Sequence, residues 1–106
     1  MSFDVVVAET AERQMHAIDS WWRLHRTAAA DLFAAEVADA FETLATHPGM
    51  GAPVRSGRVA GLRRILLRAT RFHVYYVATA RSVVVLAVWS AVRGVGPPIP
   101  TLAPPP

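Results

Sequence analysis

The side chains best suited to chemistry lie between positions 62 and 78 of this 106-residue chain. Alternate residues of a β-strand face the same side, so two strands over residues 62–68 and 71–78 can present one mixed surface. Guanidinium groups stabilise the charge that grows on a phosphate under attack, and histidine and tyrosine can transfer protons. Such a surface suits cleavage of the RNA backbone. Its members are Arg64, Arg68, Arg71, His73 and Tyr75.

Two plainer interpretations of this surface stay open. The same arginines can hold phosphates without any reaction. Each residue taken alone fits a solvated sheet edge better than a catalytic role, with Tyr75 half-buried. Neither His73 nor Tyr75 has an identifiable catalytic partner in the sequence.

Charge is divided unevenly along the chain. Residues 1–53 carry three arginines against eight acids, a net charge of −5, whereas residues 54–106 carry eight arginines and no acid, a net charge of +8. A general preference for arginine explains the absence of lysine, but it does not explain the absence of acids from the second half. The second half therefore predicts a basic face for phosphates or for an acidic partner.

Several classes of site are disfavoured by what the sequence lacks. There is no cysteine, no glycine-rich phosphate loop, and no histidine spacing typical of a metal site. We therefore expect neither a metal nor another cofactor. The apolar stretch 73–92 contains Arg81, which is costly in lipid, and the N-terminus lacks a basic signal region. We expect a cytoplasmic protein that does not contact membranes.

The elements that must position these residues follow the order β-α-α-β-β-β. A short β-branched run over residues 3–8 predicts the first strand, and Glu9-Thr10 offers the cap of a helix that ends near His25. Thr27 or Asp31 can cap a second helix, which Pro48-Gly49 stops. The apolar stripes of the two helices are Ala11, Met15, Ile18 and Trp22, then Leu32, Phe33, Val37, Ala40, Phe41 and Leu44.

The remaining strands are predicted at 62–68, 71–78 and 83–89, joined by short turns. The fold class is therefore α+β, with an N-terminal strand and an α-helical hairpin packed on a small, mainly antiparallel twisted sheet. One domain spans residues 1–96. Residues 97–106 form a proline-rich tail that we expect to be extended or disordered. On the first helix, Trp22 joins the core stripe and Trp21 points towards a contact surface.

Particular residues in this order resemble the RelE/ParE toxin superfamily of bacterial type II toxin–antitoxin systems. The resemblance covers about residues 3–96, and its motifs are loose singly but fairly specific in combination. They include Val6-Val7-Ala8-Glu9-Thr10-Ala11, Ile18-Asp19-Ser20-Trp21-Trp22, Leu44-Ala45-Thr46-His47-Pro48-Gly49, Gly61-Leu62-Arg63-Arg64, Arg71-Phe72-His73-Val74-Tyr75-Tyr76-Val77 and Val83 to Arg93.

The resemblance implies a toxin that an acidic cognate antitoxin wraps and inactivates. RelE-like members cleave mRNA on the ribosome, which would make Arg64, Arg71, His73 and Tyr75 the catalytic candidates. ParE-like members inhibit DNA gyrase. The chain has no lysine where RelE-like enzymes place basic residues, His73 stands where arginine is usual, and no tyrosine or histidine follows Trp89-Ser90-Ala91-Val92-Arg93.

These departures favour the ParE-like interpretation, in which the helical hairpin and the basic sheet contact gyrase. The binding candidates are then Trp21, Arg63, Arg68 and Arg93. A ribosome-dependent endoribonuclease is the alternative, and a relative that only binds antitoxin or nucleic acid is the third.

Overall fold

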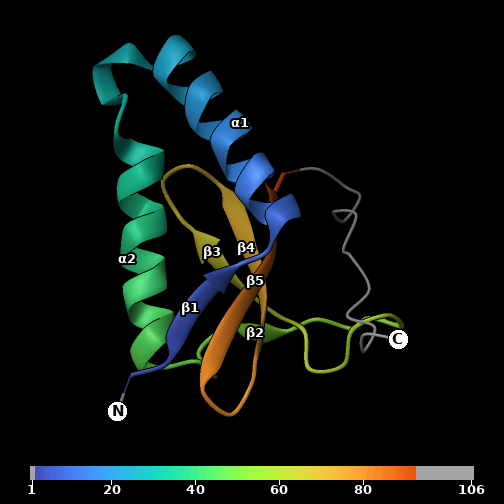
Figure 1. The fold of residues 1–106 in the computed structure, drawn as a ribbon. Helices are drawn as coiled ribbons and strands as arrows, with labels where there is room; N and C mark the ends of the chain where they lie inside the picture. The colour runs from blue at the N-terminus through green and yellow to red at the C-terminus, as the bar shows by residue number, and fades with distance from the viewer. Residues whose placement is uncertain (1, 93–106) are drawn as a thin grey trace.

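A five-stranded sheet carries two α-helices on one of its faces (Figure 1). The computed structural model describes residues 2–92. The elements are β1 (Asp4–Val7), α1 (Glu9–His25), the 3₁₀ turn η1 (Thr27–Ala29), α2 (Leu32–Thr46), β2 (Ala52–Pro53), β3 (Arg63–Leu67), β4 (Phe72–Ala78) and β5 (Ser82–Ser90). The predicted α+β class and the order of the six main elements are confirmed.

Strand β2 was not predicted, and its composition explains why. It is only two residues long and ends in Pro53, which has no backbone N–H to donate to a ladder. It pairs with β3 at the edge of the sheet, Ala52 opposite Arg64 and Pro53 opposite Arg63. Beyond these pairs the outer edge of β3 has no further strand within the described residues.

The sheet has the strand order β1-β5-β4-β3-β2. Strand β1 runs parallel to β5, with Asp4 opposite Ser82 and Val7 opposite Val85. The other three pairs are antiparallel, so the predicted, mainly antiparallel sheet is confirmed. The last strand therefore lies between the first strand and β4.

Both faces of β4 and β5 are covered, which accounts for their long apolar runs. A bulge between Tyr75 and Tyr76 leaves Leu86 without a partner in the β4–β5 ladder, since Tyr75 lies opposite Ala87 and Tyr76 opposite Val85. The helices cover one face, and the connector between β2 and β3 covers part of the other. The connector and the sheet form a small hydrophobic cluster, separate from the main core. It consists of Val59, Leu62, Tyr75, Val77, Leu86 and Ala87.

The helical stripes form the main core, as predicted. From α1, Ala11 is fully buried and Met15, Ile18 and Trp22 pack against it. The core also contains Phe33, Val37, Ala40 and Leu44 of α2, with Leu67, Val74, Tyr76, Val83, Val85 and Val88 of the sheet. Figure 1 shows the two helices meeting at one end and diverging along the sheet.

The helix starts differ from the predicted caps. The N-cap of α1 is Ala8, which offers no side-chain acceptor, and Thr10 lies inside the first turn. Glu9 and Glu12 in that turn compensate the helix dipole instead. Asp31 does occupy the N-cap of α2, but its carboxylate pairs with Arg23 at 2.8 Å rather than with a backbone amide.

Glu36 of α2 ties the helix to the turn between β3 and β4. Its carboxylate accepts hydrogen bonds from the Ala69 amide at 2.8 Å, the Thr70 amide at 2.9 Å and the Thr70 hydroxyl at 2.6 Å. Burial of the carboxyl group acts to raise its pKa, but the three hydrogen bonds outweigh it and hold the pKa of Glu36 below its usual value.

We expect Glu36→Gln to lower the free energy of unfolding by about 1–2 kcal/mol near neutral pH, because charge-assisted hydrogen bonds are lost. The ionised carboxylate stabilises the fold above pH 4.5, the usual pKa of glutamate, and this contribution is lost as pH falls through the lowered folded-state pKa. Urea unfolding from pH 3 to 7 should therefore show the two proteins converging at the acidic end. Equal stability at pH 7 would contradict this role.

No helix among residues 2–92 is long and apolar enough to cross a membrane. The predicted tail over residues 97–106 lies outside the described residues, as does Arg93.

Candidate functional site

The β3–β4 hairpin brings three of the predicted catalytic candidates together. Arg64 lies directly opposite Tyr75 in the ladder, and His73 is two residues from Tyr75 on the same face. The Arg64 guanidinium is 3.5 Å from the Tyr75 hydroxyl, which it approaches as a donor. The rings of His73 and Tyr75 meet edge to face with 5.9 Å between their centres. The predicted co-location of Arg64, His73 and Tyr75 is thus confirmed.

Arg68 adds a second cation beside this cluster. It lies in the turn after β3 and lines a cavity of about 590 Å³ together with Arg64, Leu66 and His73. No carboxylate lines this cavity. Tyr75 is buried, at 5% exposure, so its hydroxyl is less accessible than the half-buried edge predicted from the sequence. The cavity is suited to an anion.

His73 is adapted to the neutral state. Partial burial disfavours the imidazolium and the neighbouring Arg64 repels it, so the pKa of His73 is lowered from its usual value. A neutral imidazole next to an arginine can accept a proton or a hydrogen bond. This is the chemistry that a general base would need.

An NMR titration should show His73 losing its proton below pH 6.5, its usual pKa. Replacing Arg64 by glutamine is expected to raise the pKa of His73 part of the way back, because only the burial would remain. Arg68→Gln is the matched control and should change the titration less, since Arg64 is the charge that lowers the pKa of His73. An unchanged His73 titration in the Arg64 variant would contradict this account.

Arg71 does not join the cluster as expected. It was predicted as the first residue of a strand, but it ends the turn with a φ of 67°, outside the range of a strand. Both backbone groups of Arg71 are hydrogen-bonded. Its amide donates to the carbonyl of Leu67 at 2.8 Å, and its carbonyl accepts from the amide of Ala91 at 2.9 Å. The two-residue turn assumed from the sequence is four residues long, which displaces Arg71 from the strand.

The other binding candidates are also separated. Arg63 lies on the opposite face from Arg64 and donates to the carbonyls of Gly49 at 3.3 Å and Gly51 at 2.6 Å, where it holds the loop between α2 and β2. Trp21 belongs to the helical hairpin and is 44% exposed. The predicted binding residues therefore do not form a single site.

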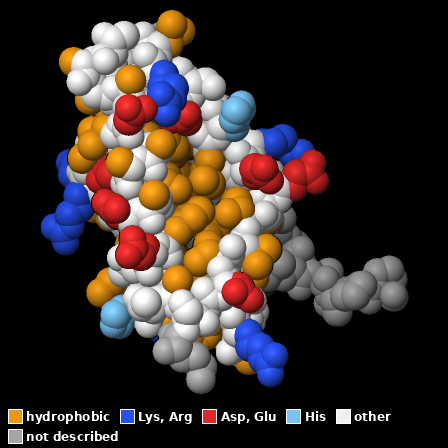
Figure 2. Space-filling model, turned by 60° about the vertical axis from the view of Figure 1, so that its left-hand side comes forward, with side chains coloured by type: hydrophobic (Ala, Val, Ile, Leu, Met, Phe, Trp, Pro, Cys, Tyr) orange, Lys and Arg blue, Asp and Glu red, His pale blue; other side chains and the backbone are white. Residues whose placement is uncertain are grey.

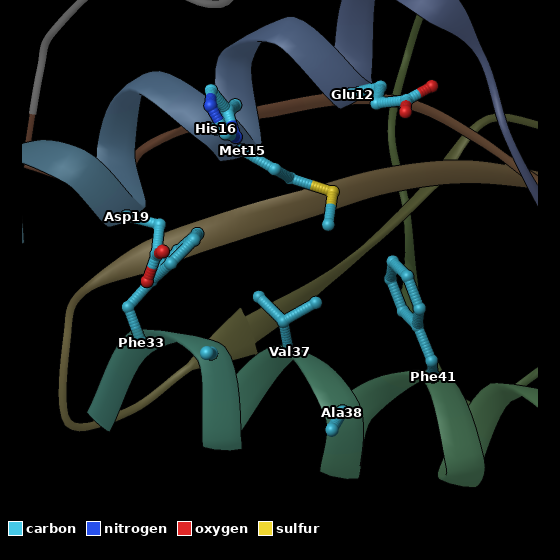
Figure 3. Close-up of a pocket in the computed structure, with 9 residues that line it drawn as sticks. Glu12, Met15, His16, Asp19, Phe33, Val37, Ala38 and Phe41 are labelled. Carbon is cyan, nitrogen blue, oxygen red and sulfur yellow. The ribbon is translucent and has the colours of Figure 1, made fainter. Parts of the chain in front are cut away.

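A second candidate site, not predicted from the sequence, is the groove between α1 and α2. Figure 2 shows apolar side chains in a hollow between the two helices, with acidic side chains around it. The hollow has a volume of about 430 Å³. In Figure 3, Met15 of α1 points towards Val37 of α2, and the rings of Phe33 and Phe41 lie on either side.

The charges on the groove walls are acidic. Glu12 and Asp19 of α1 line it, together with His16, and no arginine does. Figure 3 shows Asp19 turned towards α2, whereas His16 points away from it. A ligand that fills this groove should therefore combine an apolar stripe with basic flanks.

The sequence carried no separate signal for this groove. Phe33, Val37 and Phe41 follow the helical spacing of core residues, and that spacing is the same whether a stripe is covered by the sheet or left partly open. Ala34 and Ala38, which lie beside the stripe, are small enough to leave the hollow unfilled. Whether the stripe is covered or left partly open also depends on how the two helices cross, which the spacing of residues does not show.

One family model matches nearly the whole chain. The model describes the ParE toxin of the type II toxin–antitoxin system parDE, and residues 5–94 match it. No curated protein matches the sequence.

Solved toxin–antitoxin structures share the fold. The chromosomal ParDE system from P. aeruginosa aligns with a TM-score of 0.67 and 16% sequence identity, over 84% of this chain and 96% of that one. The RelBE2 toxin–antitoxin complex from Mycobacterium tuberculosis aligns with a TM-score of 0.62 and 25% identity, over 85% of this chain and 99% of that one.

Proposed function

Because this chain belongs to the ParE toxin family and is the toxin component of a type II toxin–antitoxin system, we propose that it inhibits DNA gyrase. In this proposal it acts in the cytoplasm through protein–protein contacts, and a cognate antitoxin holds it inactive. The observation that carries the proposal is the extent of the match to the ParE model, over residues 5–94.

The basic cavity supports a binding role more than a catalytic one. Of the arginines that would serve RNA cleavage, Arg71 lies in the turn and does not line the cavity. Tyr75 is buried and its hydroxyl faces Arg64. Arg64 and Arg68 remain available to bind an acidic segment of a partner.

The antitoxin would cover both candidate sites. An acidic stretch fits the cavity of Arg64 and Arg68, as the charge of the second half suggests. The groove between α1 and α2 fits an amphipathic helix whose apolar residues pack on Met15, Phe33 and Phe41. Basic residues on the flanks of that helix would face Glu12 and Asp19.

One observation favours ribosome-dependent cleavage of mRNA as the second candidate. Arg64 and His73 each lie beside Tyr75, and burial together with the charge of Arg64 lowers the pKa of His73, which favours its neutral imidazole. Arg64 would stabilise the charge on the phosphate, and His73 would take the proton of the attacking hydroxyl.

Two assays on the purified toxin separate the candidates. We expect the protein to block supercoiling by gyrase and to leave ribosome-bound mRNA intact. The variants His73→Gln and Arg64→Gln should then block supercoiling about as well as the parent. If the chain is instead a nuclease, His73→Gln should slow cleavage by at least about 100-fold, the usual contribution of a general base.

A protein that neither inhibits gyrase nor cleaves mRNA, yet binds its antitoxin, would support the third hypothesis, a relative that only binds antitoxin or nucleic acid. The leading proposal would be overturned if the purified protein cleaves ribosome-bound mRNA and does not inhibit gyrase.

A further inference from the structure

The end of the helical hairpin is a rigid tip. At this tip the Trp22 indole donates to the carbonyl of Ala29 at 2.9 Å, which fixes η1 against α1. Arg23 bridges the two helices, at 3.0 Å from Asp19 and 2.8 Å from Asp31. These contacts hold the side chains at the tip in place before any partner arrives, which reduces the entropy cost of binding.

Arg26 lies over two aromatic rings at this tip. The centre of its guanidinium lies 5.0 Å from the centre of the Trp21 ring and 5.9 Å from that of the Trp22 ring. One of its nitrogens donates to the carbonyl of His25 at 3.1 Å. His25 in turn stacks on Trp21, with 4.5 Å between ring centres and 14° between the planes.

Arg26 differs from the other two arginines of the hairpin. Arg13 pairs with Glu9 at 2.7 Å, and Arg23 pairs with two aspartates. Arg26 has no carboxylate partner among residues 2–92 and is exposed. It is therefore a preorganised guanidinium with free donors, a group that binds carboxylates through two parallel hydrogen bonds.

Exposed apolar side chains surround this cation. Leu24 is 75% exposed and Trp21 is 44% exposed. Tryptophan and arginine are the residues most enriched where protein interfaces concentrate their binding energy. Neither side chain is needed to complete the core, which α1 reaches through Ala11, Met15, Ile18 and Trp22.

We infer that the tip formed by Trp21, Leu24 and Arg26 is a docking site for a protein that presents a glutamate or aspartate beside an aliphatic side chain. The carboxylate binds the free edge of the Arg26 guanidinium, and the aliphatic side chain packs on Trp21 and Leu24. This site is separate from the groove and from the basic cavity, and it does not depend on which target the toxin inhibits.

A single carboxylate fits this tip better than a nucleic acid does. The first 53 residues carry a net charge of −5, and Asp19 and Asp31 lie at the tip itself, bound to Arg23. The net negative charge of this half disfavours the repeated phosphates of a nucleic acid, whereas one carboxylate aimed at Arg26 can be accommodated.

The test is an NMR titration of the full chain with a blocked peptide in which two glutamates flank a leucine. The reporters are the indole N–H of Trp21 and the Nε–H of Arg26, and the backbone amide of Asp4 in β1 is the internal control. We expect saturable shifts at the two tip signals and none at Asp4. The counterpart peptide with glutamines in place of glutamates should bind at least about fivefold more weakly.

Matched variants decide whether Arg26 itself is responsible. Arg26→Gln, and Arg26→Lys, which keeps the charge but not the planar fork, should each weaken binding about fivefold. Arg13→Gln removes the same charge from elsewhere on the helical hairpin and should leave binding unchanged. The inference is overturned if the glutamine peptide binds equally well, if Arg13→Gln weakens binding as much as Arg26→Gln, or if a single-stranded oligothymidylate shifts the tip signals while the glutamate peptide does not.

Discussion

Replacing Tyr76 by phenylalanine is expected to lower the free energy of unfolding by about 3 kcal/mol. The Tyr76 hydroxyl, at the end of a fully buried side chain, donates to the carbonyl of Pro48 at 2.7 Å and accepts from the amide of Gly51 at 2.8 Å. Phenylalanine keeps the ring but leaves the buried Gly51 amide and the partly buried Pro48 carbonyl without this partner, each costing about 1–3 kcal/mol. Urea denaturation followed by circular dichroism measures the change.

The neighbouring Tyr75 provides a matched control. Its hydroxyl makes only the 3.5 Å contact with the exposed Arg64, so Tyr75→Phe should cost less than about 1 kcal/mol. Gly51→Ala should be at least as damaging as Tyr76→Phe. A Cβ at position 51 would lie 2.6 Å from the Tyr76 hydroxyl and 2.8 Å from the carbonyl oxygen of Arg64. Equal stability of the two tyrosine variants would show that the Tyr76 hydroxyl does not anchor the loop between α2 and β2.

A tryptophan at position 34 is expected to weaken binding of the antitoxin by at least about 100-fold, which corresponds to about 3 kcal/mol. Ala34 lines the groove between the helices without belonging to the buried core. An indole there would occupy the space that we assign to the antitoxin helix, so the partner would meet a steric clash rather than a lost contact.

The adjacent Ala35 is the control for this substitution. It is also exposed on α2 but does not line the groove, since one residue turns a helix by about 100°. Ala35→Trp should therefore bind the antitoxin as the parent does. Binding of the cognate antitoxin can be measured by calorimetry. Unchanged affinity of Ala34→Trp would remove the groove from the antitoxin interface.

Most of the fold could be predicted from the sequence because its signals are local. The stripe from Ala11 to Trp22 and the proline-glycine pair after the second helix fix both helices, and the three apolar runs fix the long strands. The prediction of Glu9-Thr10 as a cap was wrong because an acidic first turn can replace a capping side chain. Strand β2 was missed because two residues carry no periodicity.

The site was predictable only where strand alternation applied. Alternation placed Arg64, His73 and Tyr75 on one face, which the ladder confirms. It failed for Arg71, because the length of the turn shifts the start of β4 by one residue. It gave no indication that Arg63 would donate to carbonyls of a distant loop. The groove and the Arg26 stack depend on how the helices cross, which no local pattern records. The roles assigned to all of these residues stay predictions.

The parallel pairing of β1 with β5 bears on when this protein becomes active during its synthesis. Residues 4–7 find their partners only at residues 82–85, so the first strand waits for nearly the whole chain to be translated. Contacts this distant in sequence also form slowly, since the intervening chain must first be ordered. The sheet therefore stays incomplete until β5 has been translated. A chain terminated before β5 lacks the strand that joins β1 to β4.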